Sequence, residues 1–273
     1  MKKFLIVLLA LLPLVCSARD FSWKRVRVDG SRTGVTATTA DNVREALGTV
    51  SVWGYTAPNG VAFRCGATPR VAKLLIDAQS QMADVKQVIG YSPEVMLRSY
   101  PECALSDWYI DEIMRAVEEK AGKHVSVGIT NFGGIRVDMP AGPVLKDDIL
   151  SMFPFKNYLC FVELRGKEVR ALLEQFAANS WQVVGGARCV VKDGKLVSAL
   201  VDGKPIDDSA IYGVATISFL LNGGDDIFVA RNAVSLEEYK DLNIIDVMLP
   251  YVLRLNEAGQ PIQYQTDGRI VYE

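Results

Sequence analysis

Helical periodicity is the clearest signal in the hydrophobic pattern of this chain. Apolar side chains three or four positions apart, the spacing of an amphipathic helix, occupy 71–88, 106–121, 167–178 and 243–256. In the second of these helices Ser106 or Asp107 is the expected N-cap, and Gly122 is the expected stop. Pro250 predicts a kink in the last one. A further short helix is expected between Asp41, its cap, and Gly48.

Runs of apolar and β-branched residues between these helices predict strands. The expected strands lie at 19–35, 125–130 and 159–164 and within 187–217, with a loop around 58–60. Asp193 and Gly194, set between two lysines, are typical of a tight hairpin turn. Helices and strands thus intermingle, which indicates an α/β or α+β fold.

The amino terminus has the pattern of a signal peptide. Lys2 and Lys3 precede an apolar run at 4–15, which is too short to span a bilayer. Cleavage after Ala18 would leave a mature chain that is exported to the periplasm or the outside of the cell. A lipoprotein anchored on Cys16 is the alternative, which Val15 disfavours because a small residue normally precedes the modified cysteine. No second apolar stretch is long enough for a transmembrane segment.

Charge and cysteine content narrow the choice of partners. A net charge of −2 with no basic stripe argues against a nucleic acid polymer and leaves a monomeric nucleotide open. After export, Cys65, Cys103, Cys160 and Cys189 could form up to two disulfides. Their spacing fits no zinc motif, and buried free cysteines are the favoured alternative.

The sequence lacks the residues of a self-contained hydrolase. It has a single histidine, His124, which cannot populate the cage of a two-metal centre and is expected at the surface. No nucleophile elbow, Walker A loop or dinucleotide fingerprint occurs. We therefore expect no catalytic residues, no metal and no cofactor in this chain.

Three loops nevertheless carry groups suited to binding. In Asn131-Phe-Gly-Gly-Ile-Arg136 the glycines allow close approach of a ligand, while the amide and the guanidinium supply hydrogen bonds. Phe155 lies between a proline and polar residues, and Phe219 ends an apolar strand just before a Gly-Gly loop. Each phenylalanine alone is more typical of core packing, but two aromatic faces could enclose a flat base.

Four motifs in this order resemble the carboxy-terminal domain of the 5'-nucleotidases. They are Asn131-x-Gly-Gly-Ile-Arg136, Pro154-Phe155-x-Asn157, Gln182-Val-x-Gly185 and Phe219-Leu-x-Asn-Gly-Gly-Asp225. The resemblance begins near Arg98 and implies a mixed sheet with flanking helices. It divides the chain into a signal peptide at 1–18, an extension of underived role at 19–97 and the main domain at 98–273.

The resemblance also implies roles for individual residues. Phe155 and Phe219 would stack on the nucleobase, Asn131 and Arg136 would hold base and ribose, and Asp225 would contact the ribose hydroxyls. The remaining substrate-binding positions that it implies are Gly133, Gly134, Asn157, Gly185 near the base edge, Asn222, Gly223, Gly224 and Arg98. The family usually has an arginine before the glutamate that is Glu102 here, but this chain has Pro101 at that position. Arg98 is included as the residue that could substitute for this arginine.

The family's histidine-rich metallophosphatase domain has no counterpart in 19–97, which contain no histidine. The resemblance therefore implies a component that recognises a nucleoside or nucleoside monophosphate and is inactive alone. It would present this ligand to a separate metallophosphatase, and any divalent metals would reside in that partner. The alternative is a stand-alone extracytoplasmic nucleotide-binding protein. A third hypothesis, a decayed pocket, is disfavoured because both phenylalanines, Asn131, Arg136 and Asp225 are retained.

Overall fold

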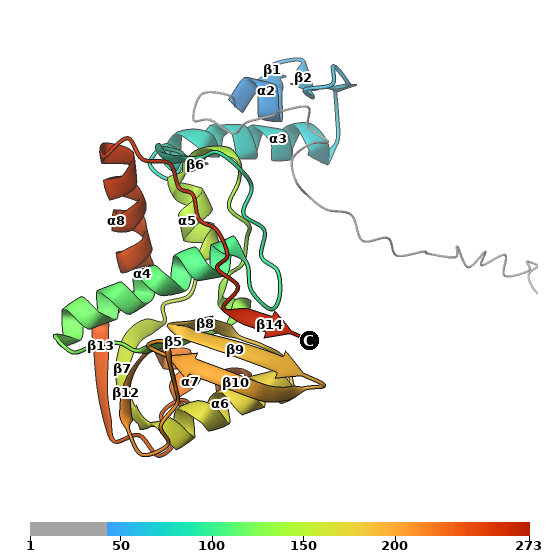
Figure 1. Ribbon diagram of the computed structural model, residues 1–273. Coiled ribbons are helices and arrows are strands. Elements are labelled where there is room, and N and C mark those ends of the chain that lie inside the picture. Colours follow the sequence, from blue (N-terminus) through green and yellow to red (C-terminus); the bar gives the residue numbers. More distant parts are fainter. Residues whose placement is uncertain (1–42) are drawn as a thin grey trace, which may run out of the picture.

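The structure is a computed structural model that describes residues 43–273. The expected signal peptide, the lipoprotein alternative at Cys16, the strand at 19–35 and the cap at Asp41 lie outside the described residues. Figure 1 shows the chain passing from a small amino-terminal unit, in blue, into a larger body of sheets and helices.

The main body is built on a five-stranded sheet of order β13-β7-β12-β5-β8. Its strands are β5 (Val127–Thr130), β7 (Tyr158–Arg165), β8 (Val183–Gly185), β12 (Ile211–Ile217) and β13 (Ser235–Asn243). Strands β12 and β5 are parallel, whereas the other neighbouring pairs are antiparallel. The mixed sheet and the mixed α/β class expected from the sequence are therefore confirmed.

A second sheet of order β11-β10-β9-β14 adjoins the first (Figure 1). It contains β9 (Ala187–Lys192), β10 (Lys195–Val201), β11 (Lys204–Pro205) and the carboxy-terminal strand β14 (Ile270–Tyr272). The hairpin between β9 and β10 is confirmed, since Asp193 and Gly194 both take the positive φ that a tight primed turn requires.

Helices cover the central sheet. In the view of Figure 1, α4 (Ala104–Ala121) lies above the strands and packs on β5 and β8, while α6 (Gly166–Ala178) lies below and packs on β7 and β10. The remaining helices are α5 (Lys146–Met152), α7 (Ser218–Leu221) and α8 (Ile244–Glu257), which contains Pro250. The side chains of Leu105, Trp108, Ile110 and Ile113 on α4 are almost fully buried and form part of the core.

The start of α4 differs from the prediction. Its N-cap is Cys103, three residues before Ser106. The Cys103 sulfur accepts a hydrogen bond from the Ser106 amide at 3.4 Å, and the Ser106 hydroxyl accepts one from the Cys103 amide at 3.1 Å. This reciprocal arrangement satisfies two buried amide donors at the helix end, so cysteine fills a place usually taken by serine or threonine. Gly122 ends the helix as expected, in a left-handed conformation.

The amino-terminal unit consists of α2 (Val43–Leu47), the small sheet β1 (Thr49–Ser51), β2 (Gly54–Thr56) and β3 (Ala62–Phe63), and α3 (Ala67–Asp77). The helix expected at 71–88 ends at Asp77 and continues as a 3₁₀ turn, Ala78–Met82. Beyond it, β4 (Val88–Ser92) pairs with β6 (Gly142–Leu145), because backbone pairing with the main body outweighs the helical spacing there.

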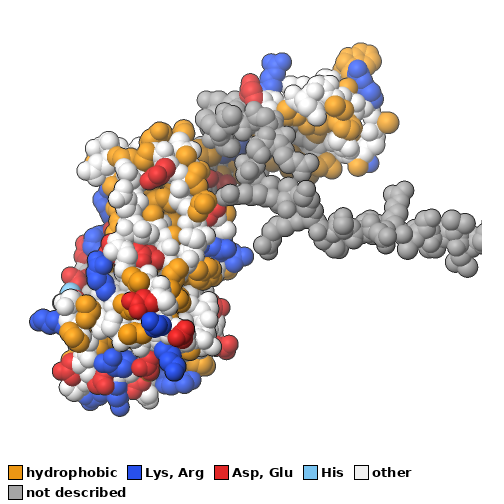
Figure 2. Space-filling model, turned by 45° about the vertical axis from the view of Figure 1, so that its right-hand side comes forward, with side chains coloured by type: hydrophobic (Ala, Val, Ile, Leu, Met, Phe, Trp, Pro, Cys, Tyr) orange, Lys and Arg blue, Asp and Glu red, His pale blue; other side chains and the backbone are white. Residues whose placement is uncertain are grey.

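Three of the four cysteines match the favoured expectation of buried free residues, whereas Cys65 does not. Cys103, Cys160 and Cys189 are buried and free, and Cys65 is exposed and free. Acidic and basic side chains alternate over the lower part of the face shown in Figure 2, while apolar side chains gather over the amino-terminal unit. Within 43–273, no helix combines the length and the hydropathy that crossing a bilayer requires.

Candidate functional site

Strand topology brings the four recognition motifs to one edge of the central sheet. The parallel strands β5 and β12 both end there; β5 continues into the loop at 131–136, and β12 continues through α7 into the turn at 222–225. Phe219 therefore lies in the short helix α7 and does not end the strand as expected. The antiparallel strands β7 and β8 begin there, directly after the segments that contain Phe155 and Gln182. Motifs far apart in sequence therefore share one surface, at the carboxyl ends of parallel strands where α/β folds commonly bind ligands.

A hydrogen bond joins the first and last of these loops. The side-chain amide of Asn131 donates to a carboxylate oxygen of Asp225 at 2.6 Å, although the two residues are 94 positions apart. Asn131 is 5% exposed, and its Oδ1 atom has no hydrogen-bond partner among the described residues. The hydrogen bond therefore holds the Asn131 side chain inside this edge, with its amide oxygen turned away from solvent.

The Gly-Gly pair before Asp225 has a steric reason. A Cβ at Gly224 would lie 2.3 Å from the carbonyl oxygen of Phe219 and 2.6 Å from its ring. Gly223 has a φ of 106°, and Asp225 is itself left-handed at 52°. The loop therefore folds tightly back over Phe219 and sets Asp225 toward Asn131, which a larger residue at 224 would prevent.

The loop at 131–136 contacts Phe155 through Arg136. The guanidinium of Arg136 lies 5.8 Å from the centre of the Phe155 ring, a cation–π distance. The same group donates to the Gly133 carbonyl at 3.2 Å. A Cβ at Gly134 would lie 3.0 Å from the Asn131 side-chain oxygen, so the glycines keep this loop close to its own amide.

The two phenylalanines are exposed to solvent. Phe155 is 45% exposed and Phe219 is 42% exposed, whereas Phe153, two positions before Phe155, is only 3% exposed. Large apolar rings left half open on a surface edge are suited to contact with a planar ligand. Phe155 contacts Arg136 of the loop at 131–136, the Asn131–Asp225 hydrogen bond joins this loop to the last motif, and the backbone at Gly224 passes close to the Phe219 ring.

Arg98 is placed to support this edge. Its guanidinium donates to the carbonyl of Ile135 at 2.7 Å and to that of Phe132 at 3.4 Å. Both carbonyls belong to the loop at 131–136, so Arg98 fixes the position of that loop. The family resemblance implied that Arg98 contacts the ligand, and it did not predict the contact of Arg98 with this loop.

The other predicted positions fall into two groups. Asn222 is exposed in the turn after α7, and the backbone carbonyl of Asn157 accepts the amide of Ile244 at 3.4 Å. Gly185 lies inside β8, paired with Gly128, and a Cβ there would strike Met114 and Ile110 of α4. The structure therefore gives Gly185 a role in packing under α4 and does not bring it to the loops.

Gln182 is a further residue of this edge that was not among the predicted contacts. Its side-chain oxygen accepts the amide of Phe132 at 3.4 Å, so it helps to hold the loop at 131–136. The signal for it was present, because Gln182 opens the third motif immediately before β8.

Comparison with known proteins agrees with this geometry. The profile of the family described as "5'-nucleotidase, C-terminal domain" matches residues 81–231. Protein UshA of Yersinia enterocolitica is 31% identical over 169 residues, which are 59% of this chain and 30% of that protein. The 5'-nucleotidase of Vibrio cholerae is 30% identical over 154 residues, which are 53% of this chain and 27% of that protein.

Solved structures show the same fold. The crystal structure of a 5'-nucleotidase precursor from Thermus thermophilus superimposes with a TM-score of 0.66 at 24% identity, over 80% of this chain and 45% of that one. This chain thus spans less than half of the proteins that it matches. The resemblance found from the four motifs is confirmed.

Proposed function

The chain belongs to the 5'-nucleotidase C-terminal domain family, and on that premise we propose that it binds a nucleoside or nucleoside monophosphate and presents it to a separate metallophosphatase. The observation that carries the proposal is the edge at which the motifs of two half-exposed phenylalanines lie beside loops that the Asn131–Asp225 hydrogen bond joins. Aromatic rings stack on any base, each contributing about 1–3 kcal/mol.

The polar groups at this edge suit the sugar and the base. Asn131 donates to one oxygen of Asp225, and an ionised carboxylate has about four acceptor positions, so it can also accept ribose hydroxyls. These contacts distinguish a nucleoside from an arbitrary flat molecule.

Hydrolysis is assigned to the partner, because the chain has one histidine and a phosphatase of this type organises two metal ions with several imidazole and carboxylate ligands. The signal-peptide pattern at 1–18 supports a meeting of the two proteins outside the cytoplasm.

Calorimetric titration of the mature protein with adenosine and adenosine monophosphate tests the proposal. If the phosphate is held by the partner's metals, the two affinities should agree within about tenfold, roughly 1.4 kcal/mol. Absence of binding to either ligand would refute nucleoside recognition. Binding of the monophosphate hundreds of times more tightly would replace presentation by the alternative, a stand-alone nucleotide-binding protein.

A pair of neighbouring variants tests the ribose contact. Asp225→Ala should reduce the preference for adenosine over 2'-deoxyadenosine, because the carboxylate that the 2'-hydroxyl would satisfy is gone. Asp226→Ala is the matched control, since Asp226 is also exposed and also has a positive φ. Equal effects of both variants would show that the preference comes from loop shape.

A further inference from the structure

A cluster of charged residues lies where the start of α4 meets the carboxy-terminal segment before β14. It contains the carboxylates of Glu102, Asp107, Asp111 and Asp267 and the guanidinium groups of Arg188 and Arg269. Asp111 accepts two hydrogen bonds from Arg269, at 2.9 and 3.0 Å, and so neutralises much of the charge of that guanidinium group. Four carboxylates facing two guanidinium groups leave an excess of negative charge.

Asp107 is the least compensated member of this cluster. Its side chain is 2% exposed, and its Oδ2 atom has no hydrogen-bond partner among the described residues. The nearest cation, Nε of Arg269, is 3.6 Å away, beyond hydrogen-bond distance, while Oδ1 receives the Ser106 hydroxyl at 3.3 Å.

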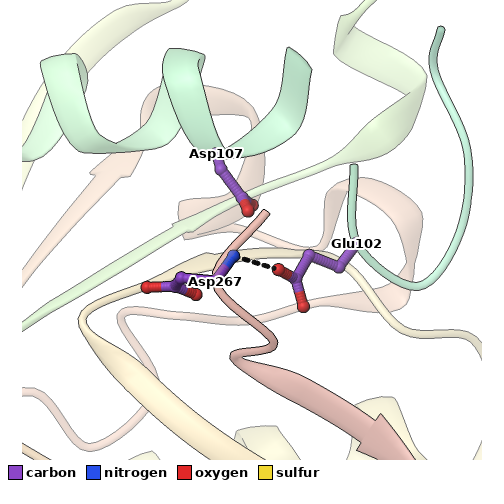
Figure 3. A group of neighbouring side chains, drawn as sticks. All are labelled: Glu102, Asp107 and Asp267. Atoms are coloured by element: carbon purple, nitrogen blue, oxygen red, sulfur yellow. Dashed lines mark hydrogen bonds between the residues drawn. The ribbon is translucent and has the colours of Figure 1, made fainter. Parts of the chain in front are cut away.

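Two further carboxylates converge on the same point. Figure 3 shows Asp107 descending from α4 toward Glu102 and Asp267, with one oxygen of each within 4.8 Å of the others. Glu102 accepts the backbone amides of Asp267, Gly268 and Ile270 at 3.0–3.1 Å, and Asp267 receives Arg269 at 3.0 Å and Arg188 at 3.2 Å. Since a carboxylate offers about four acceptor positions, both retain capacity for another ligand.

We propose that Glu102, Asp107 and Asp267 form a binding site for a hard divalent cation of the calcium class, which ties the carboxy-terminal segment to α4. Carboxylate oxygens are the ligands that such an ion prefers, and calcium accepts irregular geometry and higher coordination numbers. The ion would supply the hydrogen-bonding and charge compensation that Oδ2 of Asp107 lacks.

Solvent reaches the cluster on the side of Asp267. Surface depressions of about 360 and 440 Å³ both include Asp111, Asp267 and Arg269 in their walls. Glu102 and Asp107 line neither depression, so an ion would approach through Asp267 and keep water on that side of its shell.

The sequence did not reveal this site, and no metal was expected from it. Glu102 and Asp107 are separated from Asp267 by about 160 positions, and the three residues follow no known ligand spacing. The site is independent of the proposed nucleoside-binding edge, so its failure would leave that proposal intact.

Titration of the full mature protein, stripped of metal with a chelator, with CaCl₂ at pH 8 tests the site. We expect saturable binding of one ion and a rise in Tm of roughly 5 °C at saturating calcium. Asp107→Asn, which keeps the shape of the side chain but removes its charge, should abolish the calcium-dependent shift. Glu174→Gln, at an exposed position on α6, is the control that should retain it.

Two results would overturn the proposal. The first is the absence of saturable calcium binding together with a Tm that does not respond to calcium at millimolar concentration. The second is an unchanged calcium response in Asp107→Asn. Circular dichroism of the Asp107→Asn variant establishes that a lost response does not come from misfolding.

Discussion

Two phenylalanines that are two positions apart provide an internal comparison of core packing with ligand stacking. Phe153 is 3% exposed and its ring centre lies 4.7 Å from that of Tyr109, whereas Phe155 is 45% exposed beside Arg136. Replacing each with alanine removes the same atoms from the same short segment. The two variants should therefore lose different properties.

Phe153→Ala should destabilise the fold. Truncation of a fully buried phenylalanine costs about 3–5 kcal/mol, which for a chain of this size corresponds to a Tm lower by roughly 10 °C. Phe155→Ala should cost only about 0.8–1.5 kcal/mol, because about half of its side chain is buried and burial of a whole side chain is worth about 1.5–3 kcal/mol. Its expected loss is instead in adenosine affinity, by about 1–3 kcal/mol, or roughly 5- to 150-fold in Kd.

Thermal denaturation followed by circular dichroism measures the first quantity, and isothermal titration calorimetry at a temperature well below both Tm values measures the second. Phe219→Ala, whose ring is 42% exposed, should behave like Phe155→Ala. The stacking hypothesis would be refuted if Phe155→Ala bound adenosine as well as the unsubstituted protein does. A Tm loss as large as that of Phe153→Ala with unchanged affinity would identify Phe155 as a packing residue.

Three other predictions concern different parts of the chain. The mature protein with added divalent metal should show no nucleotidase activity above background; turnover that co-purifies with the chain through several columns would contradict this. Arg98→Ala should weaken adenosine and its monophosphate equally, by about tenfold or less, because Arg98 donates to loop carbonyls; a loss confined to the monophosphate would indicate a phosphate contact. Hydrogen bonds to Asp202 and to Glu118 raise the pKa of His124 above its ordinary value. The charged ring therefore adds a small contribution to the free energy of unfolding below pH 6.5, and this contribution is lost as the pH rises through the raised pKa. NMR titration of this histidine should show the raised pKa, and the Asp202→Asn variant should show a lower one. An ordinary pKa in both the unsubstituted protein and the variant would contradict the His124–Asp202 contact.

Local patterns in the sequence predicted the elements of the main body well. The strand before Asn131, the helix after Arg165 and the Asp193-Gly194 hairpin follow from spacing and turn chemistry, which act over a few residues. The helix expected to reach residue 88 was wrong at its end, because the pairing of β4 with β6 depends on residues more than 50 positions away.

The candidate site was predictable as a set of motifs and less so as a set of contacts. The motif order selected Phe155, Phe219, Asn131 and Asp225, and the structure joins Asn131 to Asp225 and leaves both rings half exposed. No local rule shows that Gly185 faces α4, since that depends on which side of β8 is covered. Likewise, the support that Gln182 gives to the loop at 131–136 arises from the register of β8 against β5.

The bond between Asn131 and Asp225 has a consequence for the folding reaction. It closes a span of 94 positions and forms only when β5 and β12 have paired in register, so partially folded chains lack the joined edge. A nucleoside that binds there should have affinity for the native state alone and should slow unfolding in proportion to its occupancy. If adenosine protects the chain from proteolysis, this protection would report that the whole sheet has assembled, even where the cleavage sites lie far from the bound nucleoside.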